Sequence, residues 1–387
     1  MEKRLNDEHY YRKFYFEDSF HAQCMDVDPL TMEQFDRLSA QVGTVLKDGR
    51  VVNGKRFIGT GCGDSNIVAF AAKDAFEHYL PDSEYRAVEA IELSRHFTFD
   101  DASSDTIVIA ASYSGGIYRT IEALEECRKH GMTTVAMTGN ASSKTAEAAD
   151  ILYYPNCVPG DNNAGLRTYY MNVMGMIILA AGIAEKRTGK PEIENLRKAV
   201  GEYHRSFWNK ADEIDNTCFY EAVHWIGKKQ IEIVADGPMF WAGRFIQAKV
   251  VELSGDPCTT IDSENYMHVN SLLRPGKDIA TIVLAPSYAP SIGNLAAAVN
   301  AMVSKAGREV LVFSDRKPEE IGITEKVDYC ELPLPSKGWE FLAQIYAYLP
   351  GALLADYRHT TIGEPMFRGG MDPTIFIPTY FSPVQVI

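Results

Sequence analysis

Residues 106–116 read TIVIAASYSGG, an apolar run that ends in a loop of serines and glycines. A short run of apolar and β-branched residues, bounded by turn-forming residues, predicts a buried strand. A helical pattern follows over residues 117–130, and residues 133–138 predict another strand. Strands that alternate with helices in this way predict a parallel sheet covered by helices on both faces.

The same order of strand, loop and helix recurs in the second half of the chain. Residues 231–237 read IEIVADG, residues 280–287 read ATIVLAPS, and a helical pattern over 295–305 precedes a strand at 309–314. Three pairs of landmarks recur at offsets of 175, 176 and 178 residues: Ser112 and Ser287, Gly131 and Gly307, Asp150 and Asp328. A nearly constant offset favours an internal duplication over two unrelated α/β domains that share a rhythm.

We therefore predict an α/β protein with two tandem, flavodoxin-like, doubly wound domains. The predicted segments are an N-terminal helical extension (1–49), a first domain (50–190), a helical connector (191–225), a second domain (226–356) and a C-terminal tail (357–387). Within them we expect one helix over residues 32–46 and one over 193–215. From residue 363 onward, glycine, proline and aromatic residues predict an extended tail.

Composition and charge narrow the class of partner. The 387 residues hold 38 Lys and Arg against 52 Asp and Glu, a net charge of −14, which disfavours nucleic acid and anionic lipid. The longest apolar run, residues 171–183, is short for a membrane span and predicts a buried or interface helix. No apolar stretch follows the first charged residues, so no signal peptide is expected. Seven cysteines without a CxxC pair fit a reducing cytoplasm.

The loop at residues 112–116 is a candidate phosphate site. A helix that follows a parallel strand points its unpaired N–H groups and its positive dipole end at the crevice beyond the strand. Ser112 and Ser114 add hydroxyl donors, and Gly115 lets the backbone approach an anion closely. Thr120 offers a further hydroxyl one helical turn later. The same loop also fits a helix cap with a tight turn, so the motif alone leaves both interpretations open.

Two more loops of this domain are expected at the same sheet edge. Residues 61–65, GCGDS, include Gly63 and Ser65, and residues 140–143, NASS, end in Ser143. The chain has no GxxxxGK[ST] motif, and no GxGxxG opens a helix, so neither a nucleotide triphosphatase nor a dinucleotide enzyme is indicated. No HxxxH or HExxH spacing occurs, and neither a metal site nor a cofactor is predicted.

These loops, together with TIEAL at 120–124 and AD at 149–150, resemble the sugar isomerase (SIS) domain family. The duplication resembles the two-SIS-domain phosphosugar enzymes, which include the isomerase half of glucosamine-6-phosphate synthase and the fructosamine-6-phosphate deglycases. The resemblance covers roughly residues 50–356. It implies a homodimer, with a site that its subunits can share, and a substrate that is a sugar phosphate or its amine adduct. It also implies a substrate-binding set: Gly63, Ser65, Ser112, Ser114, Gly115, Thr120, Ser143 and Lys249.

The resemblance assigns catalytic roles in the second half. It makes Glu252 the base that takes a proton from the sugar carbon, with Lys249 three positions earlier. It makes His268, sixteen positions later, the group that opens the ring or acts as an acid. Proton transfer between adjacent carbons needs such a base and acid, and an imidazole titrates near neutral pH. Without the resemblance, Glu252 also fits a surface carboxylate paired with Lys249, and His268 a loop or interface histidine.

The chain departs from the family at several positions. Ile117 stands where the phosphate loop usually has a threonine, so Arg119 or Thr120 must compensate or the loop must sit differently. Asp64 replaces a common Thr or Ser. The SYAP stretch at 287–290 of the second half lacks the serine pair, so we expect one phosphate site per chain.

Features of the two ends favour one activity within the family. The tail lacks the sugar-closing lysine of the synthase, whereas EPMFRGG at 364–370 resembles the Gly-Gly tail of deglycases. No glutamine-hydrolysing segment precedes residue 50. We therefore expect a cytoplasmic fructosamine-6-phosphate deglycase. An aldose–ketose or aminosugar phosphate isomerase is the alternative enzyme, and lyase or dehydratase chemistry on a phosphosugar acid ranks behind it. A non-catalytic sugar-phosphate-binding protein is the alternative from another class.

Overall fold

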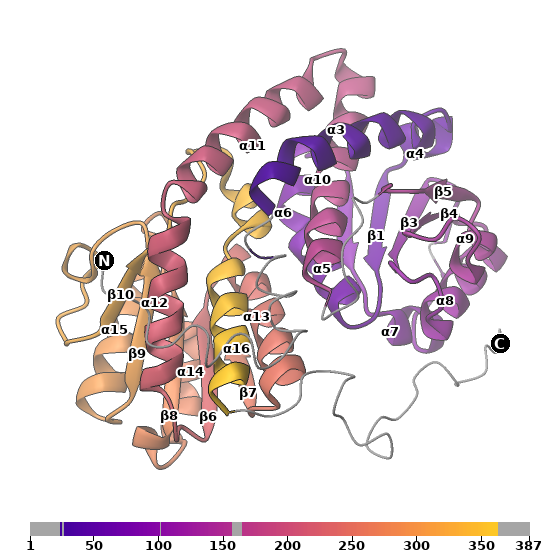
Figure 1. Cartoon of the computed structure of the whole chain (residues 1–387). Helices are drawn as coiled ribbons and strands as arrows, with labels where there is room; N and C mark the ends of the chain where they lie inside the picture. Colours follow the sequence, from indigo (N-terminus) through magenta and orange to yellow (C-terminus); the bar gives the residue numbers. More distant parts are fainter. Residues whose placement is uncertain (1–23, 25–26, 101, 157–164, 363–387) are drawn as a thin grey trace. The chain divides into compact units, whose positions relative to one another are not determined.

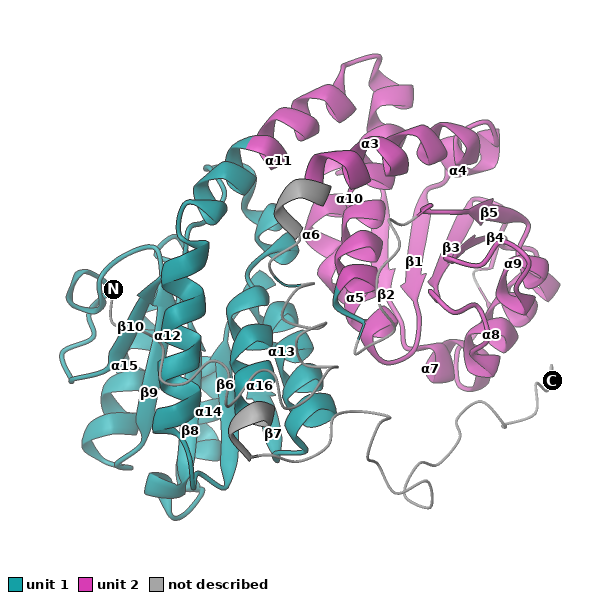
Figure 2. Cartoon of the chain, in the orientation of Figure 1, with its two compact units in different colours: residues 1–28, 161–166, 202–372 teal, residues 29–160, 167–201, 373–387 magenta. Residues whose placement is uncertain are grey.

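A computed structural model describes residue 24 and residues 27–100, 102–156 and 165–362, and the chain divides into two compact units (Figure 2). The N-terminal unit (unit 2, magenta) contains residues 29–156 and 167–201 of the described part. The C-terminal unit (unit 1, teal) contains residues 202–362 together with residues 24, 27–28 and 165–166 of the described part. Each unit is built around its own parallel sheet (Figure 1).

The N-terminal sheet has five parallel strands in the order β2-β1-β3-β4-β5, the flavodoxin-like order. The strands are β1 (Arg56–Thr60), β2 (Glu84–Ala87), β3 (Thr106–Ala111), β4 (Thr133–Met137) and β5 (Ile151–Tyr153). The helices of this half are α3 (Val27–Val45), α4 (Gly49–Asn53), α5 (Asp64–Ala71), α6 (Lys73–Tyr79), α7 (Ala90–Arg95), α8 (Tyr118–Lys129), α9 (Lys144–Ala148), α10 (Leu166–Thr188) and α11 (Glu192–Trp208).

Helices cover both faces of this sheet because its strands are apolar on both sides. Ile58 of β1 packs in one cluster with Leu93 of α7 and Ala123 of α8. The next residue, Gly59, points to the opposite face, where it lies against Ala69 of α5. All six residues of β3 are buried, as the parallel-sheet prediction requires.

The C-terminal sheet repeats this plan. Its order β10-β9-β8-β6-β7 is the same order read from the other edge, and all its pairs are parallel. The strands are β6 (Gln230–Ala235), β7 (Cys258–Ile261), β8 (Ile279–Leu284), β9 (Glu309–Ser314) and β10 (Asp328–Glu331). The α-helices are α12 (Ala211–His224), α13 (Pro238–Ser254), α14 (Ser263–His268), α15 (Ile292–Ser304) and α16 (Leu349–Ile362). Short 3-10 helices are η1 (Asn270–Leu272), η2 (Gly276–Asp278), η3 (Pro318–Ile321) and η4 (Glu340–Ile345).

The repeat extends to backbone angles. Gly63 precedes α5 with φ 57° and ψ −128°, and Gly237 precedes α13 with φ 55° and ψ −132°. A side chain is strained at such positive φ values, so each strand-to-helix turn requires glycine. The shared strand order and this shared turn confirm the predicted fold class, including its internal duplication.

Of three further sequence predictions, one is wrong, one is confirmed and one lies outside the described residues. The single helix over 193–215 is wrong: α11 ends at Trp208 and α12 begins at Ala211, since α12 turns to pack on α16, where Cys218 Sγ donates to Pro350 O at 3.0 Å. The apolar run 171–183 lies in α10, which among the described residues alone has the length and composition of a membrane span; 89% of its apolar window is buried, so it is a core helix. The extended tail lies outside the described residues.

The packing of α13 on α16 tests the C-terminal unit. A Cβ on Gly351 of α16 would overlap the side chain of Ile246 on α13, so Gly351→Ala should lower the free energy of unfolding by about 1–3 kcal/mol. Gly293 of α15 has nothing within 4 Å of the corresponding position, so Gly293→Ala is the matched control and should be neutral or stabilising by up to about 1 kcal/mol. Urea denaturation of both variants measures the difference, and equal stabilities would contradict this packing.

Candidate functional site

Two loops of the N-terminal unit are bonded to each other at the carboxyl ends of β3 and β4. Ser112 N donates to Met137 O at 2.9 Å, and Gly139 N donates to Tyr113 O at 3.0 Å. Thr138 Oγ1 also donates to Tyr113 O, at 3.2 Å. The loop after β3 is therefore fixed to the loop after β4 before any ligand arrives.

Gly115, in the loop after β3, lies directly against Ser143, in the loop after β4. Gly115 has φ +66°, and a Cβ at this position would overlap Ser143 Oγ and Cβ. Its carbonyl oxygen accepts from Thr145 N at 3.1 Å and from Thr145 Oγ1 at 2.9 Å. Only glycine fits between these groups, and the structure thus unites Gly115 and Ser143 as the sequence predicts.

The three serines of these loops keep hydroxyl protons for a ligand. Ser112 Oγ is buried and has no hydrogen-bond partner within the described part of the chain. The Ser114 side chain is exposed, and its Oγ accepts from Gly116 N at 3.4 Å. Ser143 Oγ accepts from Ala146 N at 3.2 Å and so caps α9. Ser114 and Ser143 therefore act as acceptors towards the protein, which leaves their protons to donate.

The N-terminus of α8 faces the same loop without a side-chain cap. Its N-cap residue is Ile117, which makes no capping hydrogen bond. Uncapped N–H groups at the start of a twelve-residue helix favour an anion. Arg119 of α8 and Arg95 at the end of α7 both pair with the buried carboxylate of Glu122, so two guanidinium groups lie beside the first turn of α8. Arg119 is thus engaged with Glu122 and does not simply replace the missing threonine.

The third loop is linked to α8 through Thr120. Thr120 is fully buried, and its Oγ1 donates to Cys62 Sγ at 3.6 Å. We expected this hydroxyl to bind phosphate, but in the structure it faces Cys62 and connects α8 to the loop at 61–65. Gly63 and Ser65 lie in the turn that opens α5, with Gly63 exposed and Ser65 half-buried. Burial raises the pKa of the Cys62 thiol, which disfavours a nucleophilic role.

The matching loops of the C-terminal unit are already filled by carboxylates. Asp315 accepts from Ser287 N at 2.8 Å and from Ser287 Oγ at 2.6 Å. Asp236 accepts from Ser263 N at 2.7 Å and from Ser263 Oγ at 2.8 Å. These carboxylates take the donors that an anion would need, which a sequence comparison of the serines alone does not reveal.

Glu252 and Lys249 lie together on the last turns of α13. Lys249 is fully buried, its Nζ pairs with Glu252, and it lies 4.8 Å from the centre of the Phe245 ring. The Glu252 side chain is 30% exposed, so one part of it is held by the lysine and another faces solvent. The helix ends directly afterwards at Gly255, which is left-handed with φ 70°.

His268 is the last residue of α14 and faces solvent. Its side chain is 70% exposed, and its Nε2 lies 2.9 Å from Glu264 Oε1. The segment that follows is anchored inside the unit, because Arg308 Nη2 donates to Asn270 O at 2.9 Å while Arg308 pairs with buried Glu232. His268 is therefore an exposed histidine at the end of a helix, and the segment that follows it is firmly held.

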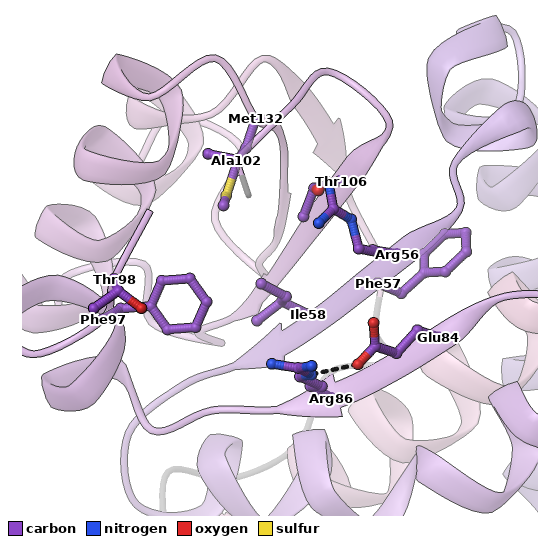
Figure 3. A pocket seen from close by; sticks show the side chains of 10 residues that line it. All are labelled: Arg56, Phe57, Ile58, Glu84, Arg86, Phe97, Thr98, Ala102, Thr106 and Met132. Atoms are coloured by element: carbon purple, nitrogen blue, oxygen red, sulfur yellow. Dashed lines mark hydrogen bonds and ion pairs between the residues drawn. The ribbon is translucent and has the colours of Figure 1, made fainter. Parts of the chain in front are cut away.

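A separate cavity of about 170 Å³ lies at the opposite, amino-terminal ends of the strands of the N-terminal sheet (Figure 3). It is lined by residues at the amino ends of β1, β2 and β3, among them Arg56, Glu84, Arg86 and Thr106. Arg86 pairs with Glu84 at 2.5 Å, and Arg56 pairs with Asp105 at 3.4 Å. Its arginines are thus matched by carboxylates, and the cavity does not belong to the serine loops.

Comparison with known proteins shows which families share these loops and this fold. Residues 51–182 match the SIS domain family. The C-terminal domain of glucosamine-fructose-6-phosphate aminotransferase from Francisella tularensis superposes with a TM-score of 0.75 at 15% identity, covering 92% of this chain and 98% of that chain. Glucosamine-6-phosphate deaminase from Thermotoga maritima superposes with a TM-score of 0.65 at 13% identity, covering 89% and 95%.

Residues 51–182 of the chain thus form a SIS domain, and the C-terminal unit repeats the same strand order. Among curated proteins it is similar to glutamine–fructose-6-phosphate aminotransferase [isomerizing] of Clostridium tetani, with 28% identity over 114 residues. That match covers 28% of this chain and only 19% of the aminotransferase.

The contact between Gly115 and Ser143 can be tested by a pair of adjacent glycines. Gly115→Ala should lower the free energy of unfolding by about 1–3 kcal/mol, because it adds both a clash and a strained positive φ. Gly116→Ala is the control, since nothing lies within 4 Å of its Cβ position, and it should change stability by less than about 0.5 kcal/mol. Urea denaturation followed by circular dichroism compares them; a tolerated Gly115→Ala would contradict the loop geometry.

Proposed function

We propose that this SIS-domain protein is an enzyme that cleaves a ketosamine 6-phosphate, a fructosamine-6-phosphate deglycase. The observation that carries the proposal is the buried, unpartnered hydroxyl of Ser112 beside the uncapped start of α8. A buried donor without a partner costs about 1–3 kcal/mol, a cost that a bound phosphate oxygen would remove.

The phosphate site consists of donors from the linked loops. Ser112, Ser114 and Ser143 donate their hydroxyl protons, and the backbone N–H groups near Gly115 complete the cradle. Arg95 and Arg119 share the single carboxylate of Glu122 beside the first turn of α8, and their positive charge adds attraction for a dianion. Gly63 and Ser65 supply the neighbouring turn, and Thr120 supports it through Cys62. We place one such site in each chain, since Asp236 and Asp315 fill the corresponding loops of the C-terminal unit.

Glu252 is the base in this proposal. Lys249 is buried and paired with Glu252, so the lysine orients the carboxylate of a side chain that stays 30% exposed. A carboxylate fixed in this way can take a proton from a carbon next to a carbonyl group. The mechanism requires that this carboxylate reaches the sugar carbons of a ligand anchored by the serine loops.

The reaction then follows from one proton transfer. Glu252 removes a proton from C1 of the ketosamine, and the electron pair forms the C1=C2 double bond of an enolamine. The π electrons of the C2 carbonyl group move to its oxygen, which takes a proton from an acid, the role given to His268. Return of the proton at C2 gives an imine between C1 and the amine nitrogen. Water adds to C1 and the C–N bond breaks, which releases the free amine and an aldose 6-phosphate. In the alternative isomerase, the substrate has oxygen in place of the amine, and the enediol is simply reprotonated.

Two observations favour the amine substrate. Two of the similar proteins are an aminotransferase and a deaminase, and the names of both combine a hexose 6-phosphate with an amino group. Asp64, which is half-buried in the loop of Ser65, offers a carboxylate that suits an ammonium better than a phosphate. A non-catalytic sensor would keep the serine loops but would need no paired carboxylate such as Glu252.

Glu252→Gln separates catalysis from binding. The variant should lose at least about 1,000-fold in kcat while its affinity for fructose 6-phosphate changes less than about threefold, because an amide keeps the shape but accepts no proton. The wild-type protein and the variant are incubated with a panel of fructosamine 6-phosphates and ketose phosphates, and products are read by mass spectrometry. Glu202→Gln, at an exposed position of α11, is the control.

The panel also decides between the activities. Release of amine and aldose phosphate supports the deglycase, whereas interconversion of ketose and aldose phosphates supports the isomerase. Full turnover by Glu252→Gln would contradict the mechanism. Binding without turnover by the wild-type protein across the panel would support the sensor instead.

We further propose that His268 acts in the site of a second copy of the chain. Exposed apolar side chains surround it: Met267 is 38%, Val269 60% and Leu272 71% exposed. Such a group favours burial against another protein surface. In this proposal His268 lies at a dimer interface and reaches the substrate of the partner.

Mixing two inactive variants tests this arrangement. Glu252→Gln and His268→Asn, each inactive alone, should regain activity when they are mixed and allowed to exchange subunits. One site of each mixed dimer then combines a native Glu252 with a native His268 from the other chain. Absence of recovery despite verified subunit exchange would place His268 in the site of its own chain.

A further inference from the structure

Three potential ligands come together at the end of α12 in the C-terminal unit. Glu221 and His224 belong to the last turn of this helix, and Asp328 is the first residue of β10. Their ligand atoms all lie within 4.8 Å of one another, and they form the one such group found among the described residues. Motif spacing did not predict this group, because Asp328 comes from a different element.

One carboxylate oxygen of Glu221 lacks a hydrogen-bond partner inside this cluster. The residue is only 8% exposed, and its Oε2 is buried without a hydrogen-bond partner among the described residues. The Nδ1 of His224 lies 3.8 Å away from it. Burial, with the nearby charges of Asp328 and Glu309, raises the pKa of Glu221 to about 7. A buried carboxylate oxygen without a partner needs an explanation, and a bound cation would supply one.

The charges around the cluster suit a divalent cation. Glu309, at the start of β9, places Oε2 3.7 Å from Nε2 of His224, and its Oε1 pairs with Lys228 at 2.7 Å. The carboxylates of Glu221, Asp328 and Glu309 thus gather around one imidazole, and one lysine faces them. The carbonyl end of α12 adds the negative pole of the helix dipole at the same place.

We propose that Glu221, His224 and Asp328 bind a divalent transition metal ion of the Zn²⁺ type. An imidazole with two carboxylates is a ligand set that Zn²⁺ accepts, whereas Mg²⁺ prefers oxygen ligands alone. Nδ1 of His224 is the ligand atom that faces Glu221, lying 3.8 Å from its Oε2. On the other side of the ring, Nε2 lies 3.7 Å from Glu309 Oε2, a carboxylate of the kind that acts as the outer partner of a metal-bound histidine. The ligand atoms of the three side chains lie within 4.8 Å of one another. Zinc–ligand distances of about 2.0–2.2 Å would bring them slightly closer together.

The site lies away from the proposed chemistry. Glu309 and Asp328 begin their strands, whereas substrate loops in such sheets follow the carboxyl ends of strands. The metal therefore has a structural role: it joins the end of α12 to β9 and β10. It is independent of the proposed deglycase activity.

Calorimetric titration of Zn²⁺ into the chelator-treated full-length protein tests the site. We expect one tight Zn²⁺ site per chain and a higher melting temperature with Zn²⁺ than with Mg²⁺. Glu221→Gln and Asp328→Asn should each weaken this binding by roughly 100-fold or more, and Glu309→Gln by roughly tenfold. His130→Gln, which alters another Glu–His pair that no third ligand joins in the described part, is the matched control and should bind as the wild type does.

Co²⁺ spectroscopy identifies the ligands if another group competes. A site of histidine and carboxylates gives d–d bands without the thiolate charge-transfer band that a cysteine such as Cys62 would produce. The proposal is overturned if Zn²⁺ does not bind, if a thiolate band accompanies the tight site, or if both Glu221→Gln and Asp328→Asn, folded by circular dichroism, keep wild-type affinity.

Discussion

The contact between Gly115 and Ser143 is the constraint on which the candidate phosphate site depends. It brings the loop after β3 against the loop after β4, and Thr145 fixes it through two hydrogen bonds to Gly115 O. Because the strands are parallel, both loops leave the same sheet edge, and the start of α8 faces them without a cap. The site is thus organised by backbone geometry before a ligand binds, which lowers the entropic cost of binding.

The two units share one fold but differ in how their loop donors are used. Both keep the strand order and the positive-φ glycine that opens the first helix. In the N-terminal unit the serine hydroxyls stay open, whereas in the C-terminal unit Asp236 and Asp315 satisfy them internally. In the proposed function one unit anchors the phosphate and the other supplies the base, while the proposed metal site supports the opposite edge of the C-terminal sheet.

The sequence predicted the strands that are buried on both faces, since their apolar runs are unmistakable. It missed β2 and β7, because these are edge strands: Glu84 and Arg86 of β2 face solvent and interrupt the apolar pattern. It merged α11 with α12, because a turn at residues 209–210 contains neither glycine nor proline. The serine loops were predicted correctly as neighbours at Gly115 and Ser143. The direction of the Thr120 hydroxyl was not, since a bond to Cys62 depends on tertiary packing that spacing along the chain does not encode.

A crystal structure of the protein with fructose 6-phosphate tests the central claim most directly. The account predicts that the phosphate oxygens accept from Ser112, Ser114 and Ser143 and from the amides beside Gly115. It also predicts that the Glu252 carboxylate lies within about 3.5 Å of C1 or C2 or of their oxygens. A phosphate bound elsewhere, such as in the cavity lined by Arg56 and Arg86, or a sugar that Glu252 does not reach, would contradict it.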